Sequence, residues 1–340
     1  MATSTPFPPD PDFVAAFRRE AGPAGTLRFD AFMRLALYDP GVGYYRRDRA
    51  RVGRDRTTDF YTATSLGSIF GELVSAACAK LLREAGLDPA AHTFVEIGAE
   101  PSGGVLAATP GHPFAGTRTL RVGEPLEIAG PCVVFSNELF DAQPVRRFVR
   151  RAAGWHELGA TLSRDGQTLR EADLGPAAPD AESFLPEAEI TPEGYIFDAP
   201  RAAAELAGMI AAQPWTGLFV AFDYGKSFAE LAHSVPAGTA RAYYRHTLSN
   251  DLLARPSEQD LTAHVCWDWL AEALAARAPA DAKPSVCSQE SFFVHHAGEA
   301  LAAALARENS PVSPVKRALM HLIHPAQMGQ KFQVLHARKD

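Results

Sequence analysis

The sequence predicts a doubly wound, Rossmann-like α/β fold with additional segments outside its central sheet. Three observations favour this class. Apolar runs with the length of strands alternate with amphipathic helical segments along most of the chain. One such run, residues 94–97, leads into a loop of small residues, and another, residues 132–135, leads into a group of polar side chains. In open α/β sheets, ligands bind where strands end in such loops.

The helical pattern is clearest between Ser65 and Ala85, where apolar residues recur every three to four positions until Gly86. Two shorter helices are predicted before it, at residues 12–21 and 29–37, the second ending at Asp39-Pro40-Gly41. The same periodicities predict further helices at 202–212, 268–276, 299–308 and 315–323, and strands at 117–122, 218–222 and 332–337.

Residues 146–170 have the alternation of antiparallel β structure, and Asp165-Gly166 is typical of a hairpin turn. We therefore predict an inserted β region at about 146–199. It interrupts a core domain at residues 65–340, and residues 1–64 supply N-terminal helices and loops that cover a site.

Composition and charge exclude several classes of protein. The 340 residues carry a net charge of −7, and the pI is near 5.9, whereas nucleic-acid binders usually present a basic face. No apolar run approaches the roughly 18–20 residues of a membrane-spanning helix, and no secretion or transit signal is recognisable. We therefore expect a cytoplasmic protein. The four cysteines are scattered without a CxxC pair, which favours reduced thiols over a disulfide or a metal site.

The turn at Glu96-Ile97-Gly98 has two interpretations. A glycine directly after a buried strand lets a ligand approach the backbone, as in nucleotide-binding folds. A glycine is equally suited to a plain tight turn. The G-x-G-x-x-G pattern of nicotinamide-binding enzymes is absent, which argues against an oxidoreductase.

The segment Asn137-Glu138-Leu139-Phe140-Asp141 also has two interpretations. Its two carboxylates are three residues apart, so one helical turn would place them on one face, where they could hold a guanidinium group. Alternatively, Asn137 caps a helix, and the acids follow because the positive end of the helix dipole favours them.

Three further segments carry polar and aromatic residues. Residues 39–45 are rich in glycine and tyrosine, and residues 58–62 contain the aromatic residues Phe60 and Tyr61; both segments either cover a site or pack as ordinary turns. Residues 258–265 suggest the start of a helix capped by Asp260 or Thr262. His264, within that segment, is more typical of a structural histidine than of a base.

The order of these segments resembles the MidA family, which includes the mitochondrial arginine methyltransferase needed for assembly of respiratory complex I. The similarity extends over nearly the whole chain. The matching segments are residues 38–45 (YDPGVGYY), 59–62 (DFYT), 70–73 (FGEL), 95–98 (VEIG), 137–145 (NELFDAQPV), 223–225 (DYG), 259–265 (QDLTAHV) and 328–335 (MGQKFQVL).

The resemblance implies a class I methyltransferase core with an inserted substrate-side β region, and a final strand that runs antiparallel to the others. It implies S-adenosylmethionine (SAM) as methyl donor, no metal, and an arginine of a partner protein as acceptor, with a subunit of a respiratory complex as one candidate. It leaves a homodimer open. By position, Asp59, Glu96, Gly98, Asn137, Glu138 and Asp141 match the family's motifs around the SAM and substrate pocket. We add Gly103 and Glu124 to the cofactor site, and His264 to Glu138 and Asp141 as a candidate for catalysis.

The chain departs from the family pattern around the cofactor site. The turn from Gly98 to Gly104 is longer than the family's glycine-rich turn and contains the acid Glu100. The stretch from Gly98 to Asn137 is much shorter than the resemblance implies. We expect it to lack one strand and helix, including the acidic strand end that binds the SAM ribose in the family. Glu124 is the nearby candidate for this contact, unless residues 118–128 match the next strand instead. These departures motivate a second hypothesis, a non-catalytic assembly or interaction factor with a degenerate SAM site.

Overall fold

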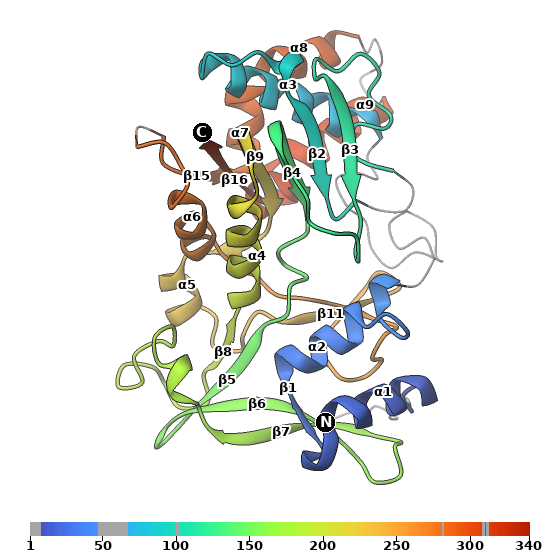
Figure 1. Ribbon diagram of the computed structural model, residues 1–340, viewed down its shortest axis with the longest axis vertical. Helices are drawn as coiled ribbons and strands as arrows, with labels where there is room; N and C mark the ends of the chain where they lie inside the picture. The colour runs from blue at the N-terminus through green and yellow to red at the C-terminus, as the bar shows by residue number, and fades with distance from the viewer. Residues whose placement is uncertain (1–7, 47–66, 100–102, 281, 308–309, 311–312) are drawn as a thin grey trace.

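The computed structural model describes residues 8–46, 67–99, 103–280, 282–307, 310 and 313–340. The chain forms an upper part, built on a six-stranded sheet with helices on both faces, and a lower part, built on a five-stranded antiparallel sheet (Figure 1). The predicted domain boundary at residues 64 and 65 lies outside the described residues, so that division stays a prediction.

The upper sheet has the strand order β15-β16-β9-β4-β2-β3. The strands β2, β3, β4 and β9 are parallel, whereas β16 runs antiparallel to both of its neighbours. This confirms the predicted class I core and its antiparallel final strand. The bounds are β2 Thr93–Ile97, β3 Gly116–Leu120, β4 Gly130–Asn137, β9 Trp215–Asp223, β15 Ser285–Ser288 and β16 Gln333–Lys339.

Helices cover the two faces of this sheet because alternate residues of its strands are apolar on both sides. Phe135 of β4 and Phe222 of β9 point into one hydrophobic cluster, and their neighbours Val134 and Ala221 point into the other. The first face packs against α3 Ser68–Glu84, α7 Gln289–His296, α8 Gly298–Ala306 and α9 Pro314–Ile323, and the second against α4 Arg201–Ala212 and α6 Trp267–Ala275.

The segment between β2 and β4 is shorter than in a full doubly wound sheet, as predicted. The described residues between these strands contain β3 and turns but no helix. Strand β3 pairs with β2 on the side away from β4, so it is the second strand of the core. The alternative that residues 118–128 form the next strand is therefore wrong.

The lower sheet has the order β1-β6-β5-β8, and β7 lies along β6. The hairpin between β6 and β7 turns at Asp165-Gly166, as predicted, with the Gly166 amide donating to the Ser163 carbonyl. N-terminal helices α1 Pro11–Ala21 and α2 Phe29–Tyr38 pack against this sheet. Its strands are β1 Thr26–Arg28, β5 Arg146–Arg151, β6 Gly154–Leu162, β7 Leu169–Pro176 and β8 Ile196–Ala199.

A small sheet lies between the two parts, with the order β12-β11-β13. It contains the segment around Asp260 and Thr262, for which a capped helix start was one interpretation. That interpretation is wrong: both residues lie in a strand, and the helix begins only at Trp267. The strands are β11 Arg241–Tyr244, β12 Thr247–Ser249 and β13 Asp260–Thr262; β10 Gly225–Lys226, β14 Val265–Cys266 and α5 Phe228–His233 lie beside them.

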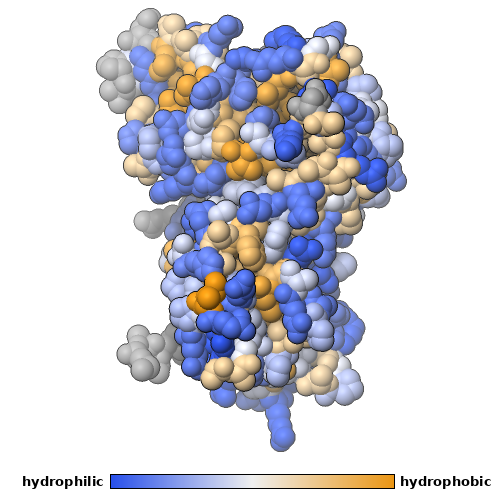
Figure 2. Space-filling model, turned by 90° about the vertical axis from the view of Figure 1, so that its left-hand side faces the viewer, coloured by the Kyte–Doolittle hydropathy of each residue, from blue (hydrophilic) through white to orange (hydrophobic). Residues whose placement is uncertain are grey.

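None of the helices in the described part of the chain is both long and apolar enough to span a bilayer. On the face shown in Figure 2, apolar side chains occur in small groups among polar ones. The largest exposed apolar side chains belong to separate elements and loops, for example Ile190, Met209 and Leu248.

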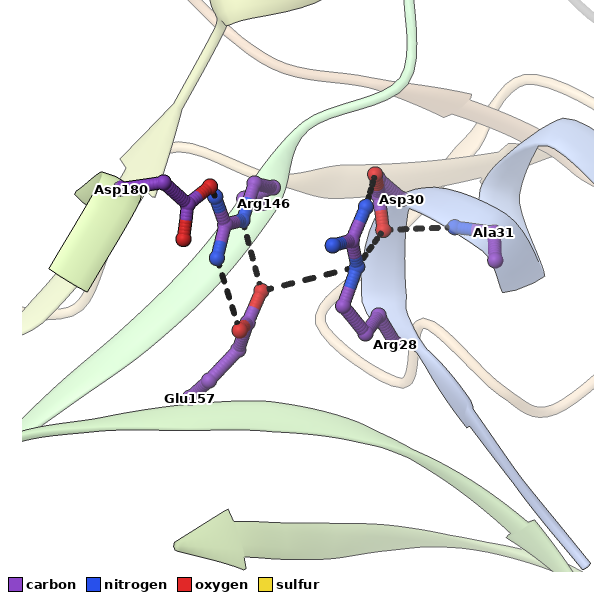
Figure 3. A network of polar contacts seen from close by, with 6 residues as sticks. All are labelled: Arg28, Asp30, Ala31, Arg146, Glu157 and Asp180. Atoms are coloured by element: carbon purple, nitrogen blue, oxygen red, sulfur yellow. Dashed lines mark hydrogen bonds and ion pairs between the residues drawn. The ribbon is translucent and has the colours of Figure 1, made fainter. Parts of the chain in front are cut away.

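A buried ionic network joins the N-terminal segment to the lower sheet (Figure 3). Arg146 of β5 is 8% exposed and binds Glu157 of β6 through two hydrogen bonds of 2.7 and 2.9 Å. Asp180 accepts a third bond at 2.6 Å. Arg28, at the end of β1, forms two bonds to Asp30 of α2 and lies 3.8 Å from Glu157. Such bidentate, charge-assisted contacts fix geometry as well as contributing energy.

This network predicts a large effect for one substitution. Glu157→Ala should lower the free energy of unfolding by on the order of 3 kcal/mol, because it leaves the buried Arg146 guanidinium without its bidentate partner. The control is Glu84→Ala, which breaks the exposed helical pair with Lys80 and should cost about 0.5 kcal/mol or less. Urea unfolding of both variants is the measurement; equal losses would contradict the assignment.

Candidate functional site

Gly98 and Asn137 lie at the same edge of the upper sheet, where the parallel strands end. Ile97 pairs with Ser136 in the β2–β4 register, and the Gly98 amide donates to the Leu120 carbonyl at the end of β3. Asn137 pairs with Phe222 of β9. The predicted placement of both residues at the carboxyl edge is confirmed. In Figure 1 the arrowheads of β2 and β3 point from this edge toward the lower part.

Glu96 holds the glycine turn that follows β2. Its carboxylate is buried and accepts a hydrogen bond of 2.6 Å from the Val105 amide. A side chain at Gly104 would lie 2.5 Å from this carboxylate, so the turn has room only for glycine there. Burial raises the pKa of Glu96 to about 7. The geometry thus gives Glu96 a role in shaping the turn.

Two glycines of the turn have backbone conformations that favour glycine. Gly98 has a φ of +81°, and Gly103 has a φ of +120°. A Cβ at Gly98 would lie 3.0 Å from the Leu139 side chain, which follows β4. The turn after β2 therefore packs against the turn after β4, and the two ends of the site are in contact.

The segment after β4 is not helical. Glu138 has a φ of +53°, a left-handed conformation that is rare for a residue other than glycine, and its amide donates to the Phe222 carbonyl. Both sequence interpretations of this segment, an Asn137 helix cap and two acids on one helical face, are therefore wrong. The Asn137 side chain instead donates to the Glu138 carboxylate at 3.1 Å, and its own oxygen is buried without a hydrogen-bond partner in the described structure.

Three buried carboxylates lie beside this segment. Asp223, at the end of β9, is fully buried and accepts hydrogen bonds from the amides of Phe140, Asp141 and Tyr224 at 2.9, 3.3 and 2.9 Å. Burial raises the pKa of Asp223 to about 8. Burial, together with the charges of Asp223 and Asp260, also raises the pKa of Asp141 well above its ordinary value.

Asp141 has an oxygen without a partner. The residue is 3% exposed, and among the described groups nothing hydrogen-bonds to its Oδ1. The Tyr224 hydroxyl binds the carboxylate, and the Asp141 carbonyl accepts from the Ala263 amide at 2.8 Å. Because buried polar atoms in folded proteins are nearly always bonded, this oxygen points to a ligand donor.

Tyrosines surround the carboxylates. Tyr38 and Tyr45 come from the N-terminal segment, and Tyr224 follows β9. Tyr243 of β11 is half-buried, pairs across the strand with Asp260, and lies near Asp141 and Glu138. Asp260, Asp223 and these tyrosines were not predicted as site residues. The signal was present for all of them except Tyr243, since each of the others lies in a motif shared with the family.

His264 lies on the other side of Tyr224. The two rings meet edge to face, with centroids 5.6 Å apart. Burial, with the nearby cations Lys226 and Arg241, lowers the pKa of His264 to about 4. The imidazole is therefore neutral at physiological pH and a weak base, and the acids that act on it are Asp198 and Glu230, which lie outside the acidic site.

Two predicted cofactor residues, Glu124 and Asp59, remain to be placed. Glu124 lies four residues after the end of β3, is exposed, and accepts a hydrogen bond of 2.8 Å from the Arg121 amide. Glu124 is thus close to the carboxyl edge, but its carboxylate stabilises the turn that follows β3. Asp59 and its motif lie outside the described residues. Within the described ranges, no three His, Cys, Asp or Glu side chains are grouped to hold a metal ion.

Comparison with known proteins agrees with this geometry. A family model described as "Putative S-adenosyl-L-methionine-dependent methyltransferase" matches residues 121–284. The crystal structure of a Burkholderia thailandensis protein bound to S-adenosyl-homocysteine superimposes with a TM-score of 0.81 at 27% identity, covering 99% of this chain and 95% of that one. The chain is a SAM-dependent methyltransferase.

The curated relatives that match this chain are named as arginine methyltransferases. The protein arginine methyltransferase NDUFAF7, mitochondrial, of Danio rerio is 23% identical over 91% of this chain and 82% of its own length. The Rattus norvegicus protein of the same name is 26% identical over 58% of this chain, and the match spans only 43% of that protein. The family resemblance predicted from the motifs is confirmed.

The buried Glu96 predicts a specific pH dependence. Because its pKa in the folded state is about 7, against 4.5 ordinarily, the folded protein binds more protons here than the unfolded chain between these values, and stability falls as pH rises. Glu96→Gln should remove this fall, so that the variant gains on the order of 3 kcal/mol relative to wild type between pH 4 and 8. Urea unfolding at both pH values measures it. A stability difference that does not change with pH would refute the buried, protonated carboxyl.

Proposed function

We propose that this methyltransferase transfers the methyl group of SAM to an arginine side chain of a protein. The names of the curated relatives support an arginine acceptor. The observation that carries the proposal is the partnerless Oδ1 of Asp141, buried among carboxylates at the carboxyl edge of the sheet. A guanidinium group presents several N–H donors and a positive charge, and it would satisfy both requirements.

The glycine turn and Asn137 fit the cofactor. Gly98, Gly103 and Gly104 bring backbone without side chains to the edge of the sheet, and the buried Asn137 oxygen lacks a partner. We infer that Glu124, four residues after β3, contacts a ribose hydroxyl of the cofactor. When bound, SAM supplies a methyl group on a positively charged sulfur.

The residues of the chain would act by placement and by proton transfer. Glu138 and Asp141 would bind the guanidinium and orient one nitrogen, which accounts for much of the rate gain in a displacement between two bound partners. An arginine side chain has a pKa above about 12 and arrives charged, so it must lose a proton when it is methylated. Asp141 suits this step, because its raised pKa makes it a better base than an ordinary carboxylate. His264 is less suited, because its pKa is about 4.

The proposal also concerns which protein carries the target arginine. The family resemblance supports a subunit of a respiratory complex as the protein that carries the arginine. The net charge of −7 favours acceptor segments with a positive charge around the target arginine. Cytoplasmic localisation and a homodimer stay predictions from the sequence.

The second hypothesis, an interaction factor without catalysis, is favoured by one observation. The described residues after β2 form turns where a doubly wound fold usually has a helix, and a helix start contributes to many ligand sites in such folds. A calorimetric titration with SAM separates the hypotheses. If SAM at millimolar concentration releases no heat and does not raise the melting temperature, the interaction factor is the better account.

Two glycine variants test the turn. Gly98→Ala should weaken SAM binding at least tenfold, because a Cβ at a φ of +81° and 3.0 Å from Leu139 must displace the turn. Gly130→Ala is the matched control: its φ is +73°, a Cβ there meets nothing within 4 Å, and it begins β4 at the opposite edge. Each should lose roughly 1 kcal/mol of stability to backbone strain. Equal SAM affinity in both variants would make the Gly98 turn an ordinary tight turn.

Asp141→Asn tests the acceptor site. The variant keeps the shape of the side chain but removes the negative charge, so kcat/KM for methylation of an arginine peptide should fall at least a hundredfold, while SAM affinity changes less than twofold. Its melting temperature at pH 8 should rise, because a buried carboxylate whose pKa is raised destabilises the folded state above its ordinary pKa. An active variant with a lower melting temperature would make Asp141 a structural residue.

A further inference from the structure

Two tyrosines of the N-terminal segment reach the acidic site through their hydroxyl groups. The Tyr38 hydroxyl donates to the Ala142 carbonyl at 3.0 Å, and the Tyr45 hydroxyl donates to the Asp260 carboxylate at 2.8 Å. Their rings are stacked, with centroids 5.5 Å apart and an angle of 21°. The two contacts lie on different walls of the site, one in the turn after β4 and the other on β13.

The turn between the two tyrosines holds them at a fixed separation. The Asp39 side chain accepts from the amides of Gly41 and Val42 at 2.8 and 3.1 Å, and its carbonyl accepts from the Gly43 amide at 2.8 Å. A Cβ at Gly43 would lie 2.7–2.8 Å from three backbone atoms, so the turn closes only with glycine. Tyr44, fully buried, packs edge to face against Tyr45.

Each hydroxyl holds a part of the site that carries a carboxylate. Ala142 follows Asp141 directly, and Gln143 fixes the same turn by donating to the Leu139 carbonyl at 2.8 Å. Asp260 is 3% exposed, and its charge acts on Asp141. The distance between the Asp141 and Asp260 side chains therefore depends on the positions of the Tyr38 and Tyr45 hydroxyl groups.

Packing alone does not account for this arrangement. Apolar neighbours would accept phenylalanine at Tyr38, as they do at Phe29 and Phe32 of the same helix. The Tyr45 ring packs on the aromatic rings beside it. A buried hydroxyl is costly unless it is bonded. Both hydroxyls are bonded to polar groups of the acidic site, and the bond to Asp260 is of the stronger, charge-assisted kind when that carboxyl is ionised.

We propose that Tyr45 is a positioning residue for the acceptor: it orients Asp260 so that this carboxylate and Asp141 bind the guanidinium of the substrate arginine together. This inference rests on the proposed arginine specificity. The N-terminal segment thereby belongs to the acceptor site, and the cofactor site at Gly98 and Asn137 is independent of the tyrosine pair.

The test uses Tyr45→Phe in the full-length protein. Two quantities are measured: the Kd of the acetylated peptide Gly-Gly-Arg-Gly-Gly in the presence of S-adenosyl-homocysteine, and kcat/KM for its methylation with SAM. The variant should weaken peptide binding and lower kcat/KM by about tenfold, as expected for a lost hydrogen bond to a charged group. Affinity for S-adenosyl-homocysteine should change less than twofold.

Two controls separate positioning from folding. Tyr195→Phe removes another tyrosine hydroxyl, which donates to the Leu231 carbonyl at 2.7 Å and accepts from the Val235 amide at 3.0 Å in the lower part, and it should leave both peptide measurements unchanged. In a double-mutant cycle, Tyr45→Phe combined with Asp260→Asn should lose little more than Asp260→Asn alone, because both act through one contact.

The outcomes distinguish this inference from the proposed function. The comparator is the same acetylated peptide with lysine in place of arginine. If wild type binds the arginine peptide tenfold better than this lysine peptide but does not methylate it, the proposed activity is contradicted, and the peptide Kd of Tyr45→Phe still decides the inference. An unchanged Kd and kcat/KM in Tyr45→Phe, or additive losses in the cycle, would overturn the inference. Wild type without preference for the arginine peptide would overturn both.

Discussion

The carboxylate of Asp223 ties the end of β9 to the turn that follows β4. It accepts three backbone amides, two of them from Phe140 and Asp141, so the chain leaving β4 has the one course that satisfies these bonds. The left-handed backbone at Glu138 is part of that course. Strain of this kind persists only where surrounding contacts determine the conformation, and here the contacts come from a strand buried in the core.

The acidic site opposes the stability of the fold. Asp141, Asp223 and Glu96 are buried in the folded state, and burial raises the pKa of each, so ionising them disfavours folding. Elsewhere the chain pairs its buried charges. Arg146 has Glu157, and Arg147 has Asp198 at 2.5 Å, which also accepts the amides of Thr239 and Ala240. Buried acids without such partners gather at the site, which is where function would retain them.

Much of the fold was predictable because its strands are buried on both faces and its main helices are amphipathic. The runs at residues 94–97 and 132–135 and the helix of residues 68–84 were recognisable for this reason. Two α-helices of the described part of the chain were missed. The pattern of α7 has no apolar stripe, although Ser288 caps it, and α5 has only six residues, although Ser227 and Glu230 form a capping box.

The site was less predictable than the fold. Its residues were found where a strand end marks them, as at Gly98 and Asn137, but the conformation after Asn137 was assigned wrongly. Local preference favours a helix after an Asn-Glu pair, and only the long-range bonds to Asp223 and Phe222 override it. Asp260 was interpreted as a cap for a similar reason, since its partner Tyr45 lies 215 positions away in the chain.

The turns that replace a helix after β2 have a consequence for which molecules the edge of the sheet can attract. In dinucleotide-binding proteins, a helix start at this place offers free amides and a positive end to a diphosphate. Among the described residues here, turns and carboxylates occupy that edge. Burial raises the pKa of these carboxylates, so a cation bound beside them stabilises their ionised form. The described part of the edge therefore lacks the positive end that a phosphate needs and favours sulfonium and guanidinium cations, so the cell's ATP and NAD would be poor competitors for this site.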